Sequence, residues 1–174
     1  MRIIRKLLAT GLVLALPLPV SAQLTIEISR GVSEAVPVAV VPFAWEGEAE
    51  VPLDVAAVIA SDLERSGRFE PMDREDKIGA ASEPQDVNFR VWRLLNTDVL
   101  VTGKVTPVPE GYEVAFFAFD VFRGDQLIGY SLKSPPGGLR AASHRAADMI
   151  FEKLTGVPGA FSTRIAYVSV EGDR

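Results

Sequence analysis

Few side chains of this 174-residue sequence have the types and spacing that catalysis requires. His144 is the only histidine, and Asp148 follows it four residues later. A nucleophilic triad would therefore have to use His144 as its general base. The surrounding helical pattern places both side chains on the polar face, which favours an exposed surface histidine. With one histidine and no cysteine, the sequence also gives little support to a transition-metal site.

Two further motifs resemble ligand sites but lack essential residues. The run 73–76 brings three carboxylates together, yet the glycine and Asn/Asp spacing of a calcium loop is missing, which favours a solvated charge run. Thr102-Gly103-Lys104 suggests a phosphate loop. Such a loop would need glycine where this chain has Asp98, and Ser or Thr where it has Val105. We therefore expect no enzyme activity, no cofactor and no metal.

The first 22 residues have the pattern of a secretory signal peptide. A basic start is followed by an apolar run over 7–16, too short to span a bilayer, and by a small-residue cleavage signal that ends at Ala22. We expect cleavage after Ala22, release into the periplasm and no transmembrane anchor afterwards. A retained membrane anchor is the alternative.

Charge and cysteine content limit the classes of partner and of fold. The whole chain has a formal net charge of −5, and the leader contains basic but no acidic residues, so the mature chain is more acidic still. An acidic chain lacks the basic face that nucleic-acid binding needs. Without cysteine there is no disulfide, so burial of apolar side chains must stabilise the domain.

The elements that would position any site follow from proline, glycine and hydrophobic spacing. A Val-rich run over 36–43, bracketed by Pro37 and Pro42, predicts a central strand covered on both faces. An amphipathic helix is predicted over 52–67, a short extended piece over 68–73 and a short helix over 86–95, the last with Val87, Val91 and Leu94 in line.

The second half of the chain has clearer signals. Runs at 96–107, 112–122 and 127–133, separated by tight turns, predict an antiparallel meander. The longest helix is predicted over 139–155 and ends at Gly156. Residues 159–163 are interpreted as an inter-domain linker, and 164–170 is strand-like again. Together the elements indicate an α/β (α+β) domain.

The strongest candidate for a binding role lies at the mature N-terminus. Residues 23–29 alternate polar and apolar side chains, as a strand with one covered face does, and 30–35 form a loop. This segment is either an edge strand of the domain sheet or a detachable strand that a partner captures by β-augmentation. The candidate partner-binding residues are Gln23, Leu24, Thr25, Ile26, Glu27, Ile28, Ser29, Arg30, Gly31, Val32 and Ser33.

Four blocks in this order resemble the TolB family of the Tol–Pal envelope system. They are the strand and glycine at 24–31, the Val40-Val41-Pro42-Phe43-Ala44-Trp45-Glu46-Gly47 block, the block at 59–69 and the long block at 151–168. The last of these is the most specific, because it contains Gly159-Ala160-Phe161-Ser162-Thr163-Arg164-Ile165-Ala166-Tyr167-Val168 at a domain junction.

The resemblance implies a fold and a set of partners. Members of the family have an N-terminal α/β domain, with a mixed sheet of about five strands and two main helices, followed by a β-propeller. We therefore expect a signal peptide over 1–22, the α/β domain over 23–160 and the start of a truncated propeller over 161–174. The resemblance assigns TolA binding to residues 23–33 and Pal binding to the propeller, in support of outer-membrane integrity and invagination during division.

The alternative function is a periplasmic small-ligand-binding domain or hydrolase. It would need a pocket lined by polar groups, expected at the C-terminal end of strand 36–43 near Phe43 and Trp45.

Overall fold

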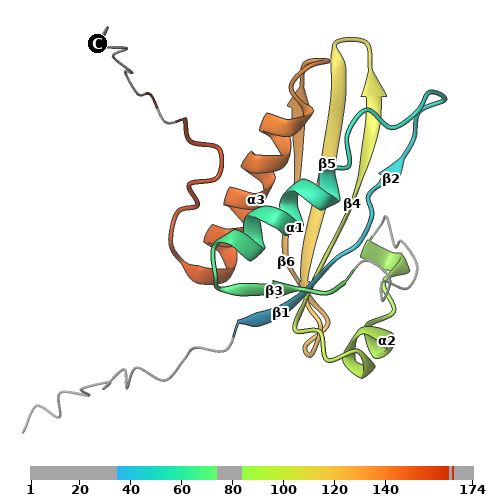
Figure 1. Cartoon of the computed structure of the whole chain (residues 1–174). Coiled ribbons are helices and arrows are strands. Elements are labelled where there is room, and N and C mark those ends of the chain that lie inside the picture. The colour runs from blue at the N-terminus through green and yellow to red at the C-terminus, as the bar shows by residue number, and fades with distance from the viewer. Residues whose placement is uncertain (1–34, 74–83, 165, 167–174) are drawn as a thin grey trace, which may run out of the picture. The chain divides into compact units, whose positions relative to one another are not determined.

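The computed structural model describes residues 35–73, 84–164 and 166. Within these residues one mixed sheet is accompanied by three α-helices (Figure 1). The elements are β1 (Val36–Val40), β2 (Ala44–Trp45), α1 (Val55–Arg65), β3 (Phe69–Pro71), α2 (Phe89–Leu94), β4 (Val99–Val108), β5 (Gly111–Asp120), β6 (Asp125–Ser134) and α3 (Leu139–Thr155). A 3₁₀ turn over Pro84–Asp86 precedes α2.

The sheet combines a parallel part and an antiparallel part. Its strand order is β3-β1-β4-β5-β6, and β2 pairs with β4 beyond the end of β1. Strand β1 is parallel to both neighbours, β3 and β4, whereas β4, β5 and β6 are antiparallel. The predicted meander and the mixed sheet with two main helices are both confirmed.

The strand predicted over 36–43 is shorter in the structure, and one of its two prolines lies in a different place from that expected. Strand β1 ends at Val40, and the short β2 resumes the pairing with β4 at Ala44. Pro42 lies in this interruption because it has no N–H to donate to a ladder. Pro37 was expected to bracket the strand but is its second residue, opposite Glu70. A proline this close to a strand end removes a single ladder bond.

Strand β1 is covered on both faces, as its sequence predicts. Val38 and Val40 belong to the core between the sheet and helices α1 and α3. Ala39 and Val41 belong to the smaller core on the face that α2 covers. All four side chains are at most 1% exposed. Burial of this extent is worth about 1.5–3 kcal/mol for each large aliphatic side chain.

Local signals define the ends of the two long helices. The Asp54 side chain accepts a hydrogen bond from the backbone N–H of Ala57 (2.9 Å) and so caps α1. Gly67, with φ of 68°, and Gly156, with φ of 73°, adopt the left-handed conformation just after α1 and α3. Helix α3 has the predicted bounds, Leu139–Thr155.

Helix α2 exposes a different face from the predicted one. Trp92 is its buried residue, at 3% exposure, whereas Leu94 is 78% exposed. The predicted alignment of Leu94 with Val87 and Val91 is therefore wrong. A six-residue helix has fewer than two turns, so the large Trp92 ring, rather than the apolar spacing, decides which face packs.

Candidate functional site

The predicted partner-binding residues, 23–33, lie outside the described residues. The structure describes the anchor to which they are attached. The backbone N–H of Val36 donates to Arg68 O (2.9 Å), and the N–H of Asp98 donates to Pro37 O (3.1 Å). The anchor is thus the start of β1, which is held between its parallel neighbours β3 and β4.

A polar depression adjoins this anchor. It has a volume of about 410 Å³. Its lining residues are Ala35, Val36, Pro37, Glu70, Asn96, Asp98 and Phe122. The Phe122 ring is 62% exposed, which is unusual for a large apolar side chain. The depression offers carboxylate and amide oxygens, which can accept hydrogen bonds, beside an exposed aromatic ring.

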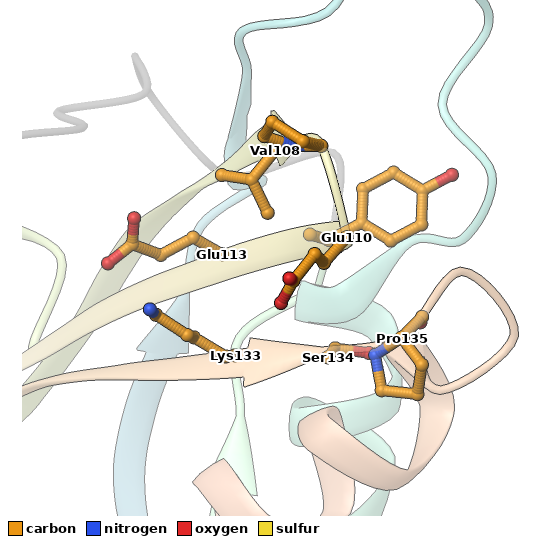
Figure 2. Close-up of a pocket in the computed structure, with 8 residues that line it drawn as sticks. Val108, Glu110, Glu113, Lys133, Ser134 and Pro135 are labelled. Carbon is orange, nitrogen blue, oxygen red and sulfur yellow. Dashed lines mark hydrogen bonds between the residues drawn. The ribbon is translucent and has the colours of Figure 1, made fainter.

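A larger groove lies at the opposite end of β4, where the β4–β5 turn meets the end of β6. Its volume is about 660 Å³, and Figure 2 shows the residues that line it. Glu113 and Lys133 lie directly opposite each other on β5 and β6. The Ser131 hydroxyl donates to Glu113 Oε1 (2.6 Å), so this carboxylate already has a partner. Gly111 is required at the turn because a Cβ there would lie 2.1 Å from Ser134 O.

The β6 strand next to this groove forms a sheet edge. Among the described elements it pairs with β5 alone. A strand edge presents backbone N–H and C=O groups, so the groove and this edge can bind an extended segment. The residues that line the groove do not place a nucleophile beside a general base.

The pocket expected near Phe43 and Trp45 is present, but its lining is mostly apolar. It has a volume of about 270 Å³ and lies between β2 and the start of α1. Asp54 is its only acidic lining residue, and that side chain caps α1. The set of polar groups that a small-ligand or hydrolase function would require is not found among the residues lining this pocket.

His144 lies at a helix interface, which corrects the prediction of an exposed surface histidine. Its Nδ1 is 2.6 Å from Oδ2 of Asp62 on α1, and its side chain is 22% exposed. Asp62 is fully buried, and Arg65 pairs with its other carboxylate oxygen. His144 is partly buried because α3 contacts α1 as well as the sheet. The covered surface of α3 is therefore wider than its apolar stripe.

This Asp–His pair has the geometry of two members of a catalytic triad but not the third. In a triad the carboxylate holds Nδ1–H and the second ring nitrogen faces a nucleophile. Among the described residues, no serine or threonine hydroxyl hydrogen-bonds to His144. The sequence signal that could have revealed the pair is Asp62 within the apolar stripe of α1.

The structure also bears on the acidic run 73–76 and on the Thr102-Gly103-Lys104 motif. Of the acidic run 73–76, only Asp73 is among the described residues. Lys104 lies within β4, and its Nζ is 3.3 Å from Glu46 Oε1. The Thr106 hydroxyl donates to Glu46 Oε2 (2.6 Å), and together with the Lys104 ammonium it holds the pKa of Glu46 below its ordinary value.

Helices long and apolar enough to cross a bilayer are not found in the part that the structure describes. Groups of three or more potential metal-ligating side chains are likewise missing from it.

Comparison with known proteins identifies relatives along most of the sequence. Residues 24–127 match the family described as the TolB amino-terminal domain. Tol-Pal system protein TolB from Thioalkalivibrio sulfidiphilus is 46% identical over 157 residues, covering 89% of this chain and 36% of the relative. The protein of the same name from Nitrosococcus oceani is 47% identical, covering 87% of this chain and 35% of the relative. The chain thus spans about a third of the length of these relatives.

A solved structure agrees with the sequence comparison. The crystal structure of TolB from Acinetobacter baumannii has 29% sequence identity and a TM-score of 0.63, covering 74% of this chain and 30% of that one. The family match extends over more than half of the sequence. The chain therefore belongs to the TolB family and contains its amino-terminal domain.

Proposed function

We propose that this chain is the amino-terminal part of a non-enzymatic periplasmic component of the Tol–Pal system. Its residues 23–33 bind the C-terminal domain of TolA, and a β-propeller that begins near residue 161 binds Pal. The protein thereby helps to maintain the outer membrane and its invagination during cell division. The observation that carries this proposal is the family match, which starts at residue 24, inside the proposed binding segment.

The sequence of this segment supports a strand-exchange mechanism. Leu24, Ile26 and Ile28 alternate with polar residues, so one face of an extended strand is apolar and the other polar. In β-augmentation the backbone supplies the hydrogen bonds and the alternate side chains enter pockets of the partner sheet. We infer that the segment either packs on its own domain or joins a TolA sheet. TolA binding then biases the rest of the protein through this shared element.

The described domain supports a scaffold role. Glu113, Glu46 and Asp54 each accept a hydrogen bond from another residue of the domain. The Asp62 carboxylate joins α1 to α3. These side chains stabilise the domain that presents the segment.

The test deletes 23–33 from the secreted protein and measures binding to the TolA C-terminal domain by titration calorimetry. We expect loss of detectable binding, while the remaining domain still unfolds in one cooperative thermal transition. A sharper pair replaces either Leu24, Ile26 and Ile28 or Thr25, Glu27 and Ser29 by alanine. Both variants keep the backbone hydrogen bonds to the partner sheet. The apolar triple variant should lose affinity because it removes the side chains that enter the pockets, and the polar one should retain most of its affinity. Unchanged affinity after the deletion would refute the proposal.

A further inference from the structure

The segment that follows α3 is held against the helix by one carboxylate. We call residues 159–163 the exit segment. Asp148 Oδ1 accepts a hydrogen bond from the backbone N–H of Phe161 (2.7 Å). Its Oδ2 accepts from the N–H of Ser162 (3.1 Å) and from the Ser162 hydroxyl (2.5 Å). Three donors on the exit segment therefore converge on a single side chain of α3, and such bonds to a carboxylate are stronger than neutral ones.

Gly159 allows the exit segment to lie close enough to Asp148 for these hydrogen bonds to form. A Cβ at Gly159 would lie 2.4 Å from Asp148 Oδ1 and 2.6 Å from Asp148 Cα, so a side chain there would push the two apart. Further along, the N–H and the hydroxyl of Thr163 both donate to Ala160 O (3.3 and 2.6 Å). The exit segment is thus a closed turn seated on α3.

Aromatic rings connect this turn with the sheet. The Phe161 ring meets Phe151 of α3 edge to face, with centroids 5.5 Å apart. Phe151 in turn meets Phe69 of β3 edge to face at 6.0 Å. Phe69 is 4% exposed and belongs to the main core. Edge-to-face contacts of this kind stabilise the packing beyond the area that they bury.

We propose that the exit segment is an orienting device with Asp148 as its anchor. It fixes the direction in which the chain leaves α3, so that whatever follows Arg164 is held in one orientation relative to the sheet. A Gly-containing connector without such anchors would sample many directions. That the following part is a β-propeller rests on the proposed function, but the anchoring itself does not.

Amide hydrogen exchange tests the anchor directly. The variants are Asp148→Ala, which removes all three acceptor contacts, and Gly159→Ala, which displaces the exit segment and leaves the α3 side chains unchanged. Glu152→Ala is the matched control, because it removes a carboxylate one turn later on an exposed face of the same helix. We expect the Phe161 and Ser162 amides to exchange about ten- to a hundredfold faster in both test variants and to remain unchanged in the control. Core amides such as Leu100 should be unchanged in all three.

Spin-label distances test the orientation. The chain has no cysteine, so labels can be introduced only where wanted. Arg140 on α3 and Ala166 beyond the exit segment are both exposed and suit this purpose. We expect a narrow distance distribution in the parent protein and in Glu152→Ala. In Asp148→Ala and Gly159→Ala it should be at least about twofold wider.

Unchanged exchange at Phe161 and Ser162 in both test variants would overturn the proposal, as would a broad label distribution in the parent. Changes of the same size in Glu152→Ala would also overturn it, because the effect would then be general to α3. Calorimetry with the TolA domain separates this result from the proposed function. Absent TolA binding together with a narrow distribution would reject the proposed function and leave the orienting role supported.

Discussion

The His144→Ala substitution should destabilise the domain more than Arg65→Ala, although both remove a partner of Asp62. The Asp62 carboxylate is fully buried between α1 and α3, with one oxygen paired to His144 Nδ1 at 2.6 Å and the other to Arg65. His144→Ala leaves Oδ2 of this fully buried carboxylate without its partner. Arg65→Ala removes a side chain that is 65% exposed.

The magnitudes follow from this difference in burial. Removing one partner of a buried ion pair costs about 3–5 kcal/mol. Because Arg65 still pairs with the other oxygen of Asp62, we expect a smaller loss for His144→Ala, about 2–3 kcal/mol. Asp62→Ala should cost less, about 1–2 kcal/mol, because it removes the buried charge and lets the imidazole contact water. Arg65→Ala should cost about 1 kcal/mol, because the space left by this 65% exposed side chain lets water donate to Oδ1 of Asp62.

A double-mutant cycle measures the pair itself. The unfolding free energies of the parent, the two single variants and Asp62→Ala/His144→Ala are obtained at pH 7 by urea titration. Circular dichroism and tryptophan fluorescence, to which the buried Trp92 contributes, serve as probes. We expect a coupling energy of about 1–3 kcal/mol between residues 62 and 144. Additive effects, or a cost of His144→Ala no greater than that of Arg65→Ala, would show that the pair contributes nothing beyond its packing.

Three further predictions concern the sheet and α2. Gly103→Ala should destabilise the domain by more than about 1 kcal/mol in urea unfolding, because its Cβ would lie 2.3 Å from Ala115 O on the neighbouring strand and backbone would have to move; a neutral effect would show that β4 and β5 can separate locally. Trp92→Ala should cost about 3–5 kcal/mol and Leu94→Ala under about 0.5 kcal/mol, since the former ring is buried and the latter side chain is not; equal costs would contradict the described face of α2. Because the folded-state pKa of Glu46 is lowered, its contribution is present above the unfolded-state pKa and is lost as pH falls through the folded one; the stability difference between the parent and Glu46→Gln should therefore shrink on acidification, and a difference that grows would refute this.

Local signals account for the parts of the fold that were predicted correctly. Helix α3 has the predicted bounds because an apolar stripe and a C-terminal glycine coincide there. The meander was predicted because its strands are long and its turns contain Gly111 and Gly124, both with positive φ. These features depend on residues close together in the sequence, so a reading of one stretch at a time can find them.

Contacts between distant segments explain what was missed. The pairing of Asp62 with His144 joins residues 82 positions apart. Neither residue alone shows it, because the relative placement of α1 and α3 is determined by the sheet beneath them. The three donors that meet Asp148 are a shorter-range case. The sequence shows a Gly-containing connector, but only the structure shows that it turns back onto the helix. The role of residues 23–33 stays a prediction.

The position of β1 has a consequence for the order in which this domain can form. Its neighbours are β3, which begins at Phe69, and β4, which begins at Val99, so the earliest described strand waits for partners that are synthesised later. The β4–β6 meander closes through short turns and can form on its own, whereas the two parallel pairings of β1 require long loop closures. Until residues 99–101 of β4 have been synthesised, the Val-rich run at 36–41 lacks the central strand with which it pairs. During that interval it is an exposed apolar strand, the kind of segment that holding chaperones shield from aggregation.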